Sequence, residues 1–201
     1  ILIGNKIEQG DPQNGKVYQL INEGTPGSPR FQMSGEFDVG GGYHFLPAFA
    51  DLDGDADLDA VLGTWGDELR FYDNQATDGS IQLTLVDSAI VTLTRGRNTT
   101  PTLGDLDSDG DADMIVGESS GTLNFYENTG TASQPEFTLI SDEYLDLDVG
   151  RRSLPVLHDF DGDGDLDLIV GSESEGIRLL LNEGTRSVPE FTDLGPLPLE
   201  H

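Results

Sequence analysis

Three nine-residue stretches decide how this chain folds: DLDGDADLD at 51–59, DLDSDGDAD at 105–113 and DFDGDGDLD at 159–167. Each has aspartate at positions 1, 3, 5, 7 and 9, and each begins 54 residues after the one before it (105 − 51 and 159 − 105). A constant spacing of this kind indicates one structural unit repeated along the chain. Five carboxylates in nine residues repel one another, so a compact fold needs something that neutralises them.

The pattern favours a hard cation as the neutralising group. Calcium takes six to eight oxygen ligands, and EF-hand loops supply them from positions 1, 3 and 5, from the main-chain carbonyl at position 7 and from a later carboxylate. The glutamate of an EF-hand at position 12 is replaced here by Leu62, Val116 and Val170. We therefore expect the aspartate at position 9 to complete each site.

Short apolar runs that end in glycine follow the loops: AVLG at 60–63, MIVG at 114–117 and LIVG at 168–171. Runs of this length, bounded by glycine and turn residues, are typical of buried strands. Each aspartate loop is therefore predicted to lead directly into a strand.

The pattern DxDxDGxxD, followed by an apolar run and glycine, resembles the FG-GAP repeat of integrin α-subunit propellers and the related bacterial VCBS-type repeats. The resemblance implies an all-β fold, a β-propeller of four-stranded blades, with one Ca²⁺ between the first two strands of a blade. It implies side-chain ligands at positions 1, 3, 5 and 9 and a main-chain carbonyl ligand at position 7. The predicted metal residues of the three sites are Asp51, Asp53, Asp55, Asp57, Asp59, Asp105, Asp107, Asp109, Asp111, Asp113, Asp159, Asp161, Asp163, Asp165 and Asp167.

The first loop departs from the repeat pattern, because Ala56 stands where the other loops have Gly110 and Gly164. Glycine adopts the backbone conformations of sharp turns at little cost, and alanine does not. We expect the first loop to be the most strained of the three and to bind calcium the most weakly.

Alignment of the repeats on their glycines predicts about four blade equivalents, the first of them incomplete. Residues 1–4 match 60–63, so the chain enters partway through a blade, and an insertion at 5–15 is expected to project from one face. Fourth strands are expected around Phe31, Leu83, Phe137 and Phe191, where the side chain returns to the core, and each next innermost strand begins at Pro47, Pro101 or Pro155. The total is fifteen predicted strands.

The predicted domain is a single β-propeller or propeller fragment at 1–198, with blade boundaries near 1–42, 43–96, 97–150 and 151–198. Residues 199–201 (LEH) resemble the remnant of a purification tag. Three assemblies stay open: a fragment of a larger ring, a small ring closed imperfectly, and a homo-oligomer in which two copies complete one ring and cover exposed strand edges.

Composition limits the partners. The 201 residues include no cysteine and have a formal net charge of −28, which three calcium ions would reduce to −22 (−28 + 6). Such acidity argues against nucleic acid or an anionic membrane surface as partner. No stretch has the length of a transmembrane helix. The composition favours a secreted or cell-surface protein in calcium-rich surroundings.

One stretch matches a catalytic motif. Residues 117–121 (GESSG) fit GxSxG, the nucleophile elbow of hydrolases, which needs a strand, a sharp turn and a helix. A strand is expected to follow here, so we do not expect an enzyme.

Arginines gather in two equivalent connectors, and Tyr43, Arg97 and Arg151 each lie four residues before the proline of an innermost strand. The arginines could form weak salt bridges with the abundant aspartates, the interpretation that we favour. Alternatively they form an anion site for uronate or sulfate groups of a polysaccharide, with tyrosine and histidine rings stacking on sugar. The candidate ligand-binding residues are Tyr43, His44, Arg97, Arg151 and Arg152.

These observations favour a non-catalytic calcium-binding propeller module of an extracellular protein, used for adhesion, protein interaction or scaffolding. The alternative function is carbohydrate binding, as a lectin-like propeller or as the accessory domain of a polysaccharide-degrading enzyme.

Overall fold

The structure is a computed structural model, which describes residues 2–4, 15–37, 39–76 and 81–198. In this part of the chain the secondary structure consists of four antiparallel sheets and one short 3₁₀ helix, η1 (Tyr144–Asp146). The insertion at 5–15 that was expected to project lies, apart from Gly15, outside the described residues.

The strands of each sheet follow one another in chain order, and each pairs antiparallel with the next. Sheet 1 has three strands, β1 (Leu2–Gly4), β2 (Val17–Asn22) and β3 (Phe31–Phe37). Sheet 2 consists of β4 (Leu46–Ala50), β5 (Asp59–Gly63), β6 (Glu68–Asn74) and β7 (Leu83–Thr92). Sheet 3 consists of β8 (Thr100–Gly104), β9 (Asp113–Gly117), β10 (Leu123–Asn128) and β11 (Phe137–Ser141). Sheet 4 consists of β12 (Leu154–His158), β13 (Asp167–Ser172), β14 (Gly176–Asn182) and β15 (Phe191–Pro196).

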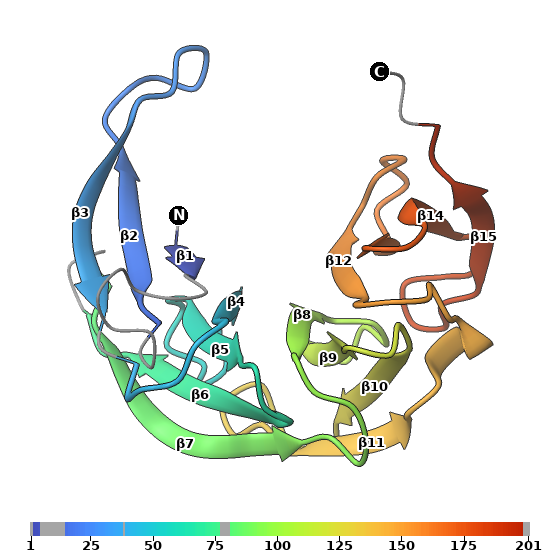
Figure 1. Cartoon of the computed structure of the whole chain (residues 1–201), viewed down its shortest axis with the longest axis horizontal. Coiled ribbons are helices and arrows are strands. Elements are labelled where there is room, and N and C mark those ends of the chain that lie inside the picture. Colours follow the sequence, from blue (N-terminus) through green and yellow to red (C-terminus); the bar gives the residue numbers. More distant parts are fainter. Residues whose placement is uncertain (1, 5–14, 38, 77–80, 199–201) are drawn as a thin grey trace.

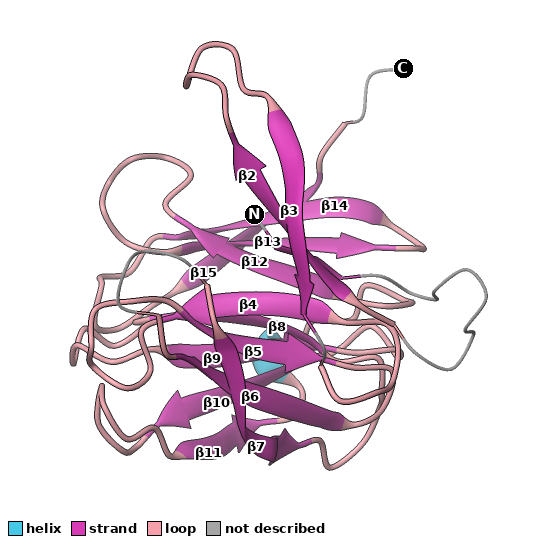
Figure 2. Ribbon diagram, turned by 90° about the vertical axis from the view of Figure 1, so that its left-hand side faces the viewer, coloured by secondary structure: helices cyan, strands magenta, loops and turns pink. Residues whose placement is uncertain are grey.

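Figure 1 shows the four sheets following one another along an arc that is open between sheet 1 and sheet 4. The first strands of neighbouring sheets lie side by side, β1 next to β4, β4 next to β8, and β8 next to β12. The hairpin of β2 and β3 extends beyond the other sheets (Figure 2). The prediction of an all-β fold with three, then four, four and four strands is confirmed for the described residues.

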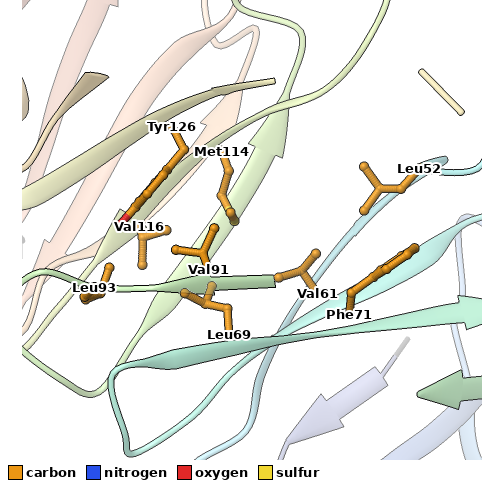
Figure 3. Close-up of a cluster of buried hydrophobic side chains, with 9 residues drawn as sticks. All are labelled: Leu52, Val61, Leu69, Phe71, Val91, Leu93, Met114, Val116 and Tyr126. Atoms are coloured by element: carbon orange, nitrogen blue, oxygen red, sulfur yellow. The ribbon is translucent and has the colours of Figure 1, made fainter. Parts of the chain in front are cut away.

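The hydrophobic core lies between the sheets. Figure 3 shows the cluster between sheets 2 and 3, in which Leu52, Val61 and Phe71 lie near Met114 and Tyr126. A second cluster joins sheets 3 and 4, and a third joins sheets 1 and 2. Successive side chains of a strand point to opposite faces of its sheet. Each middle sheet therefore contributes to two clusters, and burial of this apolar surface holds neighbouring sheets together.

One expectation about the core is wrong for the first sheet. The residue that begins the fourth strand packs against a cluster at Leu83, Phe137 and Phe191, but Phe31 is 47% exposed. The three packed residues contact the cluster that their sheet shares with the preceding one. Within the described residues, sheet 1 has no preceding sheet, so Phe31 has no such cluster to join.

Candidate metal centres

The three aspartate loops occupy the same place in sheets 2, 3 and 4, where each joins the first strand of its sheet to the second. In each loop the carboxylates of positions 1, 3 and 9 converge, with one oxygen of each within 4.8 Å of the others. The three groups are Asp51, Asp53 and Asp59; Asp105, Asp107 and Asp113; and Asp159, Asp161 and Asp167. Oxygens bound to one calcium at its usual distance of about 2.3–2.6 Å lie at most about 5 Å apart, so this spacing fits the ion.

The side chains of position 5, which are Asp55, Asp109 and Asp163, are not members of these groups. In the first loop Asp53 Oδ1 accepts the N–H of Asp55 at 3.1 Å, and Asp55 Oδ1 accepts the N–H of Asp57 at 2.9 Å. The other loops repeat both bonds. Aspartates that bond the main chain two residues on produce tight turns. The structure therefore gathers three of the four side-chain ligands that the resemblance implies, and position 5 shapes the turn.

The aspartate of position 9 has a second role that the sequence analysis missed. Asp113 is 2% exposed, and its two oxygens accept the N–H of Leu106 at 3.0 Å and that of Asn128 at 2.9 Å. Asp59 and Asp167 make the same two bonds in their sheets. Each oxygen keeps a lone pair that a metal could use. This residue thus joins the loop to the end of the third strand and also faces the candidate metal position.

The electrostatics of the loops favour a bound cation. Burial raises the pKa of Asp113 to about 6, although its two N–H bonds act in the opposite direction. Burial likewise raises the pKa of Asp59. At position 7, burial and then the charge of Asp109 raise the pKa of Asp111. Groups whose charged form is disfavoured by burial and by like charges are stabilised in that form by a nearby cation.

Several buried oxygens in the loops have no hydrogen-bond partner among the described residues. They include one oxygen of the position-7 aspartate in every loop, Asp57, Asp111 and Asp165, and Asp105 Oδ1 at position 1 of the second loop. A buried polar atom without a partner costs about 1–3 kcal/mol, so these atoms favour an ion or water beside them. An all-oxygen, strongly anionic donor set of this kind fits Ca²⁺.

A cavity of about 160 Å³ lies between the second and third loops. Asp105, Ser108, Asp165 and Arg186 are among the residues that line it, so two of the unpartnered oxygens belong to residues at its wall. The volume is large enough for several water molecules.

The loop backbone is left-handed at two positions in every repeat. At position 6, φ is +75° for Ala56, +98° for Gly110 and +97° for Gly164, so the strained backbone expected at Ala56 is confirmed. At position 4, Ser108 has a φ of +61°, where the other loops have glycine. The first loop is therefore not alone in this strain, and the sequence analysis did not single out Ser108.

The candidate ligand-binding residues lie at the opposite end of the sheets, where the hairpin between the second and third strands meets the connector from the preceding sheet. We call this end the rim. Three equivalent main-chain bonds form there: Trp65 N–H to Tyr43 O at 3.1 Å, Ser119 N–H to Arg97 O at 2.8 Å, and Glu173 N–H to Arg151 O at 2.9 Å. Tyr43, Arg97 and Arg151 therefore occupy equivalent positions in the structure as well as in the sequence.

Three of the rim side chains lie around the ring of Trp65. The sequence pattern did not point to this residue. The ring centroids of Tyr43 and His44 lie 5.6 and 5.2 Å from that of Trp65, and the Arg152 guanidinium lies 5.8 Å from it. Arg152 Nη1 also donates to Glu173 Oε1 at 2.7 Å. We call Tyr43, His44, Trp65 and Arg152 the Trp65 group.

Two of the connector arginines form salt bridges, as the favoured interpretation predicted. Arg95 pairs with Asp142 and Glu143, and Arg152 pairs with Glu173. Arg97 and Arg151 are exposed, and among the described residues neither forms an ion pair.

The GESSG stretch forms the turn between β9 and β10, so a strand follows it, as expected. The hydroxyls of Ser119 and Ser120 both donate to the carboxylate of Glu118, which is 1% exposed. Glu118 also accepts the N–H of Ser120 at 2.7 Å. The two serines therefore satisfy a buried carboxylate inside a hairpin turn.

Residues 51–116 match the family model described as FG-GAP-like repeat. No curated protein gave a significant match to the chain. In the described part, no helix is long and apolar enough to cross a membrane. The matched segment begins at the first residue of one aspartate loop, contains the whole of the next, and ends in the strand that follows it. Residues 51–116 therefore contain an FG-GAP-type repeat.

Proposed function

We propose that this chain is a non-catalytic, calcium-stabilised module of a secreted or cell-surface protein, which presents a rigid surface for adhesion, protein interaction or scaffolding. FG-GAP repeats are typical of extracellular interaction modules. In this proposal the three loops each bind one Ca²⁺, and the sheets form part of a β-propeller.

One observation carries the proposal: the same three carboxylates converge in all three loops, and each group is attached to its sheet through a buried aspartate. Repeated metal sites of this kind stiffen a scaffold, because an ion that binds only the folded chain stabilises it. Their identical placement in successive sheets favours a structural role over a reaction at any one loop.

Calcium titration of the whole chain, by calorimetry and by equilibrium dialysis, tests the metal assignment. We expect three sites. Asp107→Ala removes a position-3 ligand from the second loop only, so this variant should bind two ions, whereas Asp87→Ala, outside the loops, should keep three. A wild-type chain that binds no calcium, or an Asp107→Ala chain that keeps three sites, would contradict the proposal.

The Trp65 group favours carbohydrate binding as a second candidate function. Trp65 is half-buried, and three partners from two separate connectors fix its ring. Aromatic faces pack on the apolar faces of sugar rings, and a guanidinium pairs bidentately with carboxylate or sulfate. The expected ligand is therefore an acidic polysaccharide, recognised at the rim.

A glycan array run in calcium tests this candidate, with the wild-type chain beside Trp65→Ala and Arg152→Gln. Binding to sugars that contain uronate or sulfate, lost in both variants, would support it. Arg30→Gln removes an equally positive but distant, exposed side chain and should bind like wild type. Equal binding by all four chains, or no binding by any, would exclude the Trp65 group as a sugar site.

A further inference from the structure

Every sheet of the arc has two faces, which we name by their neighbours: the forward face points to the next sheet and the rear face to the preceding one. The forward faces of sheets 1, 2 and 3 are covered by the rear faces of sheets 2, 3 and 4, and the three hydrophobic clusters lie in these contacts. Within the described residues, the forward face of sheet 4 and the rear face of sheet 1 have no such neighbour (Figure 1).

The second position of each aspartate loop shows the difference on the forward side. Leu52 is 1% exposed and packs in the cluster between sheets 2 and 3, and Leu106 is 3% exposed and packs in the cluster between sheets 3 and 4. Their counterpart in sheet 4 is the larger Phe160, which contacts the His158 ring of its own sheet and is 40% exposed. This side chain occupies a core position without the sheet that would cover it.

The innermost strand of sheet 4 continues the same face. In sheet 3, Thr100 Oγ1 donates to Ser153 O at 2.8 Å, and Thr102 Oγ1 accepts the N–H of Leu157 at 3.2 Å, so this strand bonds directly to sheet 4. The corresponding residues of β12 are Leu154 and Val156, which are 40% and 50% exposed. Where the covered face of sheet 3 has these hydroxyls, the uncovered face of sheet 4 presents aliphatic side chains that water solvates poorly.

The rear side of sheet 1 is uncovered in the corresponding way. Phe31 is 47% exposed, although its counterparts Leu83, Phe137 and Phe191 all pack on the cluster shared with a preceding sheet. The chain therefore has, at its two ends, an uncovered forward face and an uncovered rear face. These are the two surface types that pair with each other three times inside the molecule.

We propose that two copies of this chain associate head to tail, with the rear face of sheet 1 in one copy packing on the forward face of sheet 4 in the other. The occupant is a second copy because the only surface type that covers a forward face in this structure is a rear face, and this chain carries one uncovered. The contact is heterologous, so it closes into a ring or continues as a row of copies according to its rotation. The proposal goes beyond the proposed function and does not depend on calcium binding or on a sugar ligand.

Sedimentation velocity over a wide range of protein concentrations, with calcium present, tests the contact. The wild-type mass should rise with concentration. Phe160→Asp on the forward face and Phe31→Asp on the rear face should each weaken association by roughly thirtyfold or more, the effect of a central interface residue. Both side chains are substantially exposed in the single chain, so we expect the variants to fold, which thermal melting checks.

Mixing the two variants gives the sharpest result. Phe160→Asp retains an intact rear face and Phe31→Asp an intact forward face, so an equimolar mixture should regain one contact and form a dimer. Val86→Asp and Val188→Asp place the same charge on exposed apolar residues, 58% and 61% exposed, outside both faces, and should associate like wild type. A wild-type chain that stays monomeric, a Phe31→Asp variant that still associates, or a mixture that stays monomeric would overturn the proposal.

Discussion

The two ends of the sheets repeat in different ways. At the loop end, side chains and bonds recur together, because Asp59, Asp113 and Asp167 make the same pair of main-chain contacts in three sheets. At the rim only the main-chain bonds recur, and the residues that form them change from Trp65 to Ser119 to Glu173. We therefore expect substitutions at the loop end to affect stability more than substitutions at the rim, which retains its backbone geometry while its side chains vary.

Of the changes considered, removal of calcium from the loop end should lower the stability of the chain the most. A ligand at a hundred times its Kd stabilises a fold by about 2.7 kcal/mol per site, and independent sites add, against a typical net stability of about 5–15 kcal/mol. We expect chelator to lower the melting temperature steeply and sodium chloride to restore part of it by screening the carboxylates. Calorimetry with calcium and with chelator measures the melting temperature. If the two melting curves coincide, calcium at the loop end does not stabilise the chain.

Replacement of one buried aspartate should have the next largest effect. Asp113→Ala leaves the N–H groups of Leu106 and Asn128 without acceptors, which should cost about 2–4 kcal/mol in chelator and more in calcium, where a metal ligand is lost as well. Asp107→Ala loses a single bond, to the N–H of Asp109 in the exposed part of the loop. It should therefore destabilise the chain mainly in calcium. Urea unfolding in both conditions separates the two, and identical responses would contradict the double role of position 9.

A smaller effect is expected from the left-handed loop backbone. Ala56→Gly should stabilise the chain by about 1 kcal/mol, because alanine at positive φ is strained. Gly110→Ala is the reverse exchange in the second loop, where an added Cβ has no neighbour within 4 Å, so conformational strain alone should destabilise it by about 1 kcal/mol. Urea unfolding in chelator measures both values without a metal contribution. Changes of the same sign in the two variants would disprove the equivalence of these positions.

The rim should show the smallest effect on stability. The double substitution Arg97→Ala with Arg151→Ala removes two exposed side chains and leaves their carbonyl bonds in place, so the free energy of unfolding should change by less than about 0.5 kcal/mol. Chemical unfolding in calcium checks this. A loss as large as that of Asp113→Ala would mean that the rim side chains are structural after all.

The sequence predicted the fold well because its strongest signals are local and repeated. The aspartate loops, the glycine-ended runs after them and the proline near the start of each innermost strand recur 54 residues apart. One correct interpretation of the repeat therefore applied to three sheets. The double role of Asp113 was missed, although a signal exists: an asparagine follows each position-9 aspartate by 15 residues, as Asn74, Asn128 and Asn182.

Other features had no repeated signal. Arg152 reaches Trp65 from a connector two sheets farther along the chain, and the positions equivalent to Trp65 hold Ser119 and Glu173, so comparison of repeats could not indicate the contact. The short helix η1 has no counterpart in the other connectors of the described chain. The absence of Asp55, Asp109 and Asp163 from the converging groups depends on local turn geometry, which the one-letter pattern does not contain.

The position of the core between sheets has a consequence for how such a chain can change over evolutionary time. Because the clusters form between a forward face and a rear face, no single sheet encloses a core of its own, and each depends on its nearest neighbours. A duplication or deletion of one whole 54-residue unit preserves that pairing, whereas a partial one leaves a sheet without its match. Chains of this design are therefore free to lengthen and shorten in whole units, and the apolar faces at their ends are the places where the next unit can be added.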